Sequence, residues 1–239
     1  MSAPLVDRLE LPAGGERFAG RHEVVAGTLL LEGERLPVVV KKVPVDWRQR
    51  LAGRTKARRS FETARALLER GIDTPEPLAA ETVGGEGWFV ARLLPEARQV
   101  REWFRHRYEP GFPEPGLPIP FGDVVGGLGR LARRMHDSGV FFRDLTDGNV
   151  LVTEEAGRPR LWLVDLNRAR VGTRPVGFWN RLRDLSRPGV NALADRRLLV
   201  AAYLGPGRPV GPTLVLVTLL RARIRGWDEL KRVLRPWRR

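Results

Sequence analysis

Two short acidic motifs in the middle of the chain constrain its fold more than any other feature. In the first, Asp144 is followed five positions later by Asn149, which leads into the apolar residues 150–152. In the second, the apolar residues 161–164 end at Asp165. Apolar runs of this length bounded by polar residues are typical of buried strands. The sequence therefore predicts two neighbouring strands that carry these three polar side chains at their ends.

This order of side chains indicates phosphoryl transfer, a reaction that depends on charge neutralisation and on an aligned acceptor. Asp144 is predicted to accept the proton of the acceptor hydroxyl. Asn149 and Asp165 are predicted to bind Mg²⁺, which prefers oxygen ligands. A single Asp or Asn at a strand end is usually a turn or cap residue. The prediction therefore depends on the three residues occurring together.

A lysine in the first part of the chain completes the predicted site. Lys41 follows Val38-Val39-Val40, and a lysine on such a strand can reach the α- and β-phosphates of ATP. Strand alternation directs Lys42 to the opposite face. An acidic partner for Lys41 is expected from the next helix, where Glu62 is preferred over Glu69 because Glu69 is close to the helix end. A solvated strand lysine is the alternative.

The remaining sequence predicts an α+β chain with two lobes of the protein-kinase-like type. Residues 1–94 form the predicted N-lobe, which covers the nucleotide with strands and one helix. Residues 95–239 form the predicted C-lobe, with the catalytic loop, the metal site and the other helices. The predicted elements are strands at 23–31, 36–43 and two within 82–94, and helices at 49–70, 101–106, about 123–139, 176–185, 192–203 and 212 onward. In the helix near 123–139, Asp123 is the expected cap. No G-x-G-x-x-G loop is present, and Gly14, Gly15, Gly20 and Gly27 are only candidates for the nucleotide-covering turn.

The composition of the chain limits the classes of metal site and binding partner that it can have. The chain has 239 residues, no cysteine and a formal charge of +14, so thiolate metal sites are excluded and an anionic partner is favoured. A GC-rich coding sequence would also raise the arginine content. The sequence contains no signal-peptide pattern and no apolar stretch of membrane-spanning length, so a cytoplasmic protein is expected. The segment 221–239 mixes tryptophan and leucine with eight Arg or Lys residues, which suits either peripheral contact with an anionic membrane, on its inner cytoplasmic face, or a packed final helix.

The chain resembles the bacterial lipopolysaccharide core kinases, the Kdo and heptose kinase group of the protein-kinase-like superfamily. The resemblance extends from about Val38 to Tyr203. It rests on the segments 38–41, 71–75 and 135–140, on Asp144 with Asn149, and on the segment 164–170, where Asp-Leu-Asn stands in place of the Asp-Phe-Gly of protein kinases. It implies ATP- and Mg²⁺-dependent phosphorylation of a sugar hydroxyl on an anionic glycolipid acceptor.

Other functions remain open at this stage. A protein kinase is disfavoured because Thr146 replaces the usual lysine two residues after Asp144, and Phe142 replaces the usual histidine. An aminoglycoside phosphotransferase is disfavoured because the positive charge would repel a polycationic acceptor. A pseudokinase that binds a partner without turnover is the main alternative. A nucleic-acid-binding protein is supported only by the positive charge. Nucleic acid is therefore not expected as a partner.

Overall fold

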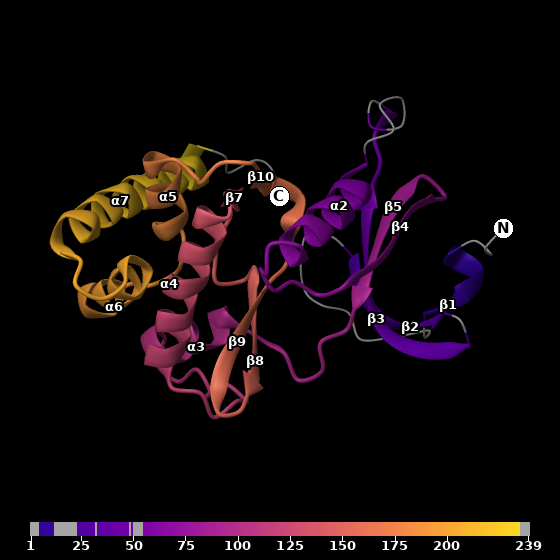
Figure 1. Ribbon diagram of the computed structural model, residues 1–239, viewed down its shortest axis with the longest axis horizontal. Helices are drawn as coiled ribbons and strands as arrows, with labels where there is room; N and C mark the ends of the chain where they lie inside the picture. The colour runs from indigo at the N-terminus through magenta and orange to yellow at the C-terminus, as the bar shows by residue number, and fades with distance from the viewer. Residues whose placement is uncertain (1–4, 12–22, 32, 48, 50–54, 235–239) are drawn as a thin grey trace. The chain divides into compact units, whose positions relative to one another are not determined.

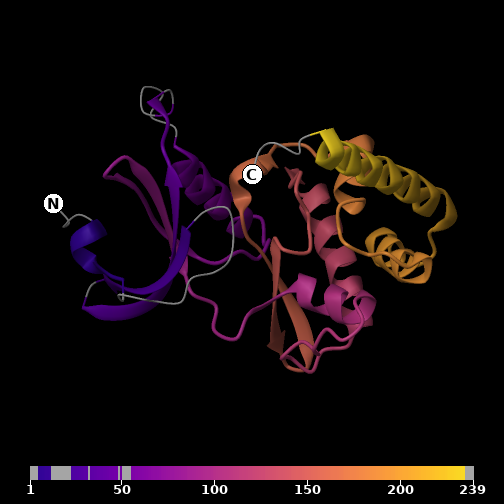
Figure 2. The ribbon, with the colours of Figure 1, turned by 180° about the vertical axis from the view of Figure 1, so that it is seen from behind.

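The computed structural model describes residues 5–11, 23–31, 33–47, 49 and 55–234. The chain forms two compact units (Figures 1 and 2). The first unit is Met1–Ala97 with Trp162–Arg168, and the second unit is Arg98–Leu161 with Ala169–Arg239. Strands dominate the first unit and helices the second, so the predicted α+β class is confirmed. The functional division into a nucleotide lobe and a catalytic lobe stays a prediction.

The first unit contains an antiparallel sheet of five strands in the order β1-β2-β3-β5-β4. These strands are β1 (Leu9–Glu10), β2 (Glu23–Leu31), β3 (Glu34–Pro44), β4 (Pro77–Val83) and β5 (Glu86–Arg92), preceded by the 3-10 helix η1 (Leu5–Arg8). Leu31 pairs with Glu34 across the β2–β3 turn, and Gly33 in that turn has φ of 86°. Only glycine adopts this backbone conformation without steric cost, so Gly33 permits the tight turn between the two strands.

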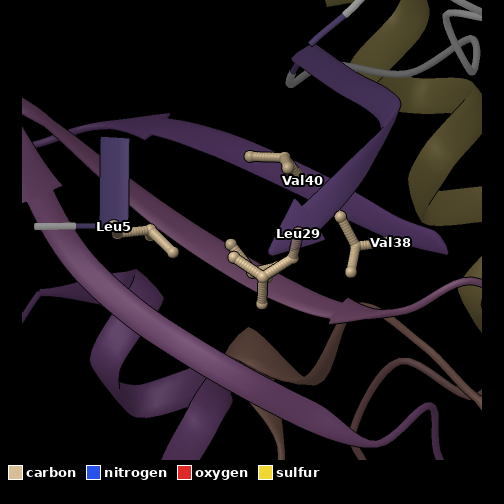
Figure 3. Close-up of a cluster of buried hydrophobic side chains, with 5 residues drawn as sticks. Leu5, Leu29, Val38 and Val40 are labelled. Carbon is tan, nitrogen blue, oxygen red and sulfur yellow. The ribbon is translucent and has the colours of Figure 1, made fainter. Parts of the chain in front are cut away.

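Alternation along β3 gives the sheet two different faces. On one face, Leu29, Val38 and Val40 are buried against Leu5 of η1 (Figure 3). On the other face, α2 (Lys56–Leu68) packs against the sheet, with Ala57 close to Gly87 of β5. Lys41 belongs to this second face because it is one residue from Val40.

The helix predicted at 49–70 begins later than expected. Thr55 is its N-cap, and the Thr55 hydroxyl accepts a hydrogen bond from the amide of Arg58 at 3.2 Å. A threonine at this position satisfies one of the backbone donors that a helix start leaves without a partner. Residues 50–54 lie outside the described residues, as do Gly14, Gly15 and Gly20 of the candidate nucleotide-covering turn.

Gly27, the fourth candidate, lies in the middle of β2. A Cβ at this position would be 2.8 Å from the carbonyl oxygen of Glu10 in β1. The glycine therefore permits the close approach of two strands.

In its described residues, which end at Leu234, the second unit combines five helices with short strands. The helices are α3 (Val100–Tyr108), α4 (Phe121–Asp137), α5 (Phe178–Leu185), α6 (Leu193–Leu204) and α7 (Gly211–Leu234), and the strands are β6 (Arg98–Gln99), β7 (Val140–Phe141), β8 (Val150–Glu155), β9 (Arg158–Leu163) and β10 (Arg170–Val171). The two strands predicted from the acidic motifs are β8 and β9, which pair in a sheet of order β6-β8-β9. None of the helices in the described part of the chain is long and apolar enough to cross a membrane.

Helix α4 forms the centre of the second unit. Its apolar positions Val124, Leu128, Leu131 and Met135 are almost fully buried, as the helical spacing predicts. A Cβ on Gly129 would be 2.5 Å from a carbonyl oxygen of α6, so this glycine lets the two helices approach closely. The expected cap was wrong: the helix begins at Phe121 after Pro120, so Asp123 lies in the first turn, where a negative charge suits the helix dipole.

Candidate active site

The strand lysine and the second acidic motif meet within the first unit. Lys41 Nζ donates to Asp165 Oδ1 at 2.6 Å, although 124 residues separate them in the sequence. Lys42 points the other way, as alternation predicts, and pairs with Glu23 at 3.3 Å. Residues 162–168 belong to the first unit because Leu163 also exchanges hydrogen bonds with the 73–74 segment: its amide donates to the carbonyl of Asp73, and its carbonyl accepts from Thr74 Oγ1.

Asp165 is held by a chain of hydrogen bonds that reaches α2. The 3-10 helix η2 (Leu166–Arg168) follows Asp165 directly. Within it, Asn167 Nδ2 donates to Asp165 Oδ1 at 2.8 Å. The hydroxyl of Ser60, in α2, donates to Asn167 Oδ1 at 2.7 Å, and Ser60 is only 4% exposed. We call this series, Lys41–Asp165–Asn167–Ser60, the Asp165 chain.

Both hydrogen bonds to the Asp165 carboxylate end on the same oxygen. Oδ1 accepts from Lys41 Nζ and from Asn167 Nδ2. A carboxylate that is oriented by hydrogen bonds from Lys41 and Asn167 is a suitable ligand for Mg²⁺. The backbone at Asp165 has φ of 57°, a left-handed conformation that Asp tolerates better than most residues.

Glu62, the expected partner of Lys41, has another contact in this structure. Its carboxylate accepts from Arg58 Nε at 2.9 Å, one helical turn earlier, and its side chain is 63% exposed. The buried face of α2 carries instead the small residues Ala57, Ser60, Thr63 and Ala64. The observed carboxylate partner of Lys41 is Asp165, and a pairing of Lys41 with Glu62 stays a prediction.

The first acidic motif forms a compact turn in the second unit. The carbonyl of Asp144 accepts hydrogen bonds from the amide of Thr146 at 2.7 Å and from Asn149 Nδ2 at 2.9 Å. Because the amide nitrogen of Asn149 is used in this way, its oxygen points away from that carbonyl. An amide oxygen is a neutral ligand of the kind that Mg²⁺ accepts. The side chain of Asn149 is thus oriented by the backbone of the predicted base.

A buried carboxylate that the sequence analysis did not single out holds this turn from behind. Asp184, in α5, is fully buried, and it accepts hydrogen bonds from the amides of Phe142 and Arg143, each at 2.9 Å. Arg143 has φ of 71°, an unfavourable conformation for a residue with a side chain. The two hydrogen bonds stabilise this conformation just before Asp144. The available signal was that Asp184 is the only acidic residue in α5.

His136 lies next to Asp184, the residue that binds the turn before Asp144, and Tyr203 lies next to His136. His136 is fully buried at the end of α4, where Nε2 lies 3.4 Å from Asp184 Oδ2 and Nδ1 lies 3.1 Å from the Tyr203 hydroxyl. Burial raises the pKa of Tyr203, so this hydroxyl keeps its proton at neutral pH. The buried imidazole of His136 thus links α4 to Asp184 of α5 and to Tyr203 of α6.

The predicted metal ligands belong to separate units, Asn149 to the second and Asp165 to the first. Among the described residues, no group of three or more His, Cys, Asp or Glu side chains could hold a metal ion. Each predicted ligand, taken by itself, offers an oxygen donor: the carboxylate of Asp165 in the first unit and the side-chain amide of Asn149 in the second. Mg²⁺ prefers oxygen ligands, so both residue types fit the predicted metal.

Comparison with known proteins identifies relatives with named activities. The chain is 34% identical over 137 residues to a 3-deoxy-D-manno-octulosonic acid kinase of Xanthomonas campestris pv. campestris (strain B100), which is 57% of this chain and 49% of the relative. It is 25% identical over 120 residues to the enzyme of the same name from Vibrio parahaemolyticus serotype O3:K6, which is 48% of this chain and 44% of the relative. The chain thus spans about half the length of the curated relatives that it matches.

A solved structure and a family model extend the comparison over more of the chain. The structure of WaaP in complex with acyl carrier protein matches with a TM-score of 0.60 at 20% identity, and the match covers 92% of this chain and 88% of that chain. This likeness confirms the predicted protein-kinase-like fold. The sequence model of the lipopolysaccharide kinase (Kdo/WaaP) family matches residues 35–189. Because this match covers more than half of the sequence, the chain belongs to the lipopolysaccharide kinase (Kdo/WaaP) family.

Proposed function

We propose that this protein transfers a phosphoryl group from ATP to a sugar hydroxyl of the lipopolysaccharide core. The observation that carries the proposal is the ion pair between Lys41 and Asp165, 2.6 Å apart on the first unit. A phosphate-binding lysine and a metal-binding aspartate must both be in position for this chemistry. The family membership and the named activities of the relatives support the same reaction.

The proposed site residues have two roles, the binding of charged groups and the transfer of a proton. We assign Lys41 to the α- and β-phosphates of ATP, and Asp165 and Asn149 to Mg²⁺. When bound, the metal ion neutralises the charge of the transferred phosphoryl group. We assign Asp144 as the base that takes the proton of the sugar hydroxyl while its oxygen attacks the γ-phosphorus and the bond to ADP breaks. Glu62 stays a predicted second partner of Lys41.

An anionic glycolipid is the acceptor class that best fits this chain. The formal charge of +14 raises the local concentration of anionic molecules and disfavours polycationic acceptors. The alternative is a pseudokinase, which would bind a partner without turnover. A noncatalytic scaffold has no chemical need for Asp144, Asn149 and Asp165 together.

Calorimetric titration of ATP with and without Mg²⁺ tests the nucleotide site. Wild-type protein is expected to bind ATP more tightly with Mg²⁺, and Asp165→Ala is expected to lose that metal dependence because it removes the one carboxylate that we assign to the metal ion. Asp123→Ala, a change of an exposed carboxylate on α4, is the control and is expected to behave as the wild type. Glu62→Gln, measured alongside, would lose ATP affinity only if Glu62 also supports Lys41.

The result separates an enzyme from a binding protein. Metal-dependent binding followed by transfer of labelled phosphate to a Kdo-containing lipid acceptor would support the kinase. Binding without transfer to any core sugar would favour the pseudokinase. Absence of ATP binding in the wild type would contradict the proposal.

We further propose that the protein contacts the cytoplasmic face of an anionic membrane through α7. On this helix Val215, Leu219 and Trp227 are 57%, 62% and 58% exposed, whereas Arg221 is only 8% exposed. Val215, Leu219, Arg223 and Trp227 are spaced four residues apart, so they follow one side of the helix. This side combines apolar surface with positive charge, the composition of helices that bind at lipid interfaces.

Arg221 is an integral part of the opposite, packed side of α7. Its guanidinium donates to the carbonyls of Ser186 and Pro188 and to Asn191 Oδ1. Burial, followed by the charges of Arg225 and Arg196, lowers the pKa of Arg221 to about 10. The arginine therefore fixes the α5–α6 connection to α7, and this contact leaves Val215, Leu219 and Trp227 on the outer side of the helix.

Vesicle sedimentation tests the membrane contact. The protein is expected to bind vesicles that contain phosphatidylglycerol and not vesicles of phosphatidylcholine alone. Leu219→Glu is expected to weaken that binding roughly tenfold, because one leucine loses its burial in lipid. Leu68→Glu, an exposed leucine of α2 in the first unit, is the matched control. Equal binding by the two variants would contradict an interface on α7.

A further inference from the structure

The Asp165 chain connects three elements of the first unit that are far apart in sequence. Lys41 comes from β3, Asp165 and Asn167 flank the start of η2, and Ser60 comes from α2. Each link has a donor–acceptor distance between 2.6 and 2.8 Å, which is within the range of good hydrogen bonds. The helix therefore reaches the predicted metal ligand through a neutral serine and an amide.

No acidic residue of α2 takes part in this connection. Glu62, the only acidic residue between Lys56 and Leu68, pairs with Arg58 on the exposed side of the helix. Ser60 is instead buried on the side that contacts η2. The position of α2 is thus linked to Lys41 through the metal-binding turn.

We infer that Ser60 and Asn167 are positioning residues that hold Asp165 in its metal-binding orientation. This inference deepens the proposed function and rests on it. By donating to Asn167 Oδ1, Ser60 fixes the amide so that its nitrogen faces the carboxylate. Asn167 and Lys41 together occupy Asp165 Oδ1, and the carboxylate thereby presents Oδ2 to a divalent cation.

The geometry of the turn explains why such support is needed. The left-handed backbone at Asp165, with φ of 57°, costs about 1 kcal/mol or more for a residue other than glycine. A carboxylate on such a turn loses entropy when it binds a metal ion unless its rotamer is already fixed. Partners of this kind, one step removed from the metal, typically change metal affinity or activity about 10- to 100-fold when they are mutated.

The test compares hydroxyl removal at two buried positions of α2. Ser60→Ala removes the hydroxyl that donates to Asn167 in the Asp165 chain. Thr63→Val removes the hydroxyl of a residue on the same helix that is 8% exposed and is not part of the Asp165 chain. Calorimetry of a nonhydrolysable ATP analogue over a range of Mg²⁺ concentrations gives the half-saturating Mg²⁺ concentration for each variant. Ser60→Ala is expected to raise this concentration roughly tenfold, with nucleotide affinity in the absence of metal unchanged. Thr63→Val is expected to leave both quantities as in the wild type.

A double-mutant cycle separates positioning from general loss of packing. Asn167→Ala is expected to raise the half-saturating Mg²⁺ concentration at least as much as Ser60→Ala. The double variant is expected to match Asn167→Ala alone, because Ser60 acts through Asn167. Additive effects, or a Ser60→Ala variant that matches Thr63→Val, would overturn the inference while the wild type still binds Mg²⁺ and ATP. A wild type without metal-dependent binding would instead overturn the proposed function.

Discussion

Asp144→Asn is expected to bind ATP and Mg²⁺ as the wild type does and to lose about 10²- to 10⁴-fold in turnover, the usual contribution of a general base. The substitution preserves the shape of the side chain but removes its ability to take a proton. The backbone carbonyl of Asp144, which accepts from Thr146 and Asn149, is unchanged, so the turn is expected to keep its conformation. Steady-state phosphate transfer and calorimetry on the same preparation measure the two properties separately.

Asp147→Asn, three residues further along the same turn, is the matched control. The Asp147 carboxylate lies 3.7 Å from Arg101 Nε, and the Asp147 carbonyl accepts from the amide of Arg101. Only the partly exposed ion pair is affected by this change, so a loss in turnover of less than about fivefold is expected. Turnover that persists in Asp144→Asn, or falls equally in both variants, would remove the assigned role of Asp144.

Asp184→Ala is expected to destabilise the second unit by about 3–5 kcal/mol, because it leaves the buried amides of Phe142 and Arg143 without an acceptor. For a chain of this size the loss corresponds to a decrease of roughly 10 °C in melting temperature. Thermal unfolding followed by circular dichroism measures it. Asp184→Asn keeps one oxygen acceptor and is expected to have a smaller effect.

The comparison for this prediction is Asp123→Ala, which removes an exposed carboxylate from the first turn of α4. Its expected cost is about 0.3–1 kcal/mol, from the loss of a favourable interaction with the helix dipole. If Asp184→Ala were no more destabilising than Asp123→Ala, the hydrogen bonds from the amides of Phe142 and Arg143 to Asp184 would not be what stabilises the turn before Asp144.

Local patterns in the sequence predicted most of the secondary structure. The spacing of Val124, Leu128, Leu131 and Met135 predicted a buried helix, and all four residues are buried in α4. The apolar runs beside Asn149 and Asp165 became β8 and β9. Such periodicity is a property of neighbouring residues, so it can be read without knowledge of the fold. The start of α4 was misjudged because Asp123 is a good cap by type but lies within the first turn.

Contacts between residues far apart in the sequence were harder to predict. The charge of Glu62 and its place in the middle of a helix predict it as a partner of Lys41; in this structure it pairs with Arg58 and its side chain is 63% exposed, and its pairing with Lys41 stays a prediction. The sequence does not distinguish Asp184 from a surface residue, because a single acidic residue in a helix is usually exposed to solvent. Whether such a residue is buried depends on the packing of α4, α5 and β7, which the sequence of α5 alone does not encode.

The sequence by itself determined the identity and order of the chemical groups: a strand lysine, an Asp–Asn pair before one strand and an Asp after the next. These groups occur in short motifs whose spacing is fixed by the covalent chain. Only the tertiary structure decided which side chains orient them, since Lys41 and Asp165 are 124 positions apart, Ser60 and Asn167 are 107 apart, and Arg143 and Asp184 are 41 apart. Hydrogen bonds at such separations form only when packing brings the elements together, because the cost in chain entropy is met by the burial of apolar residues around them.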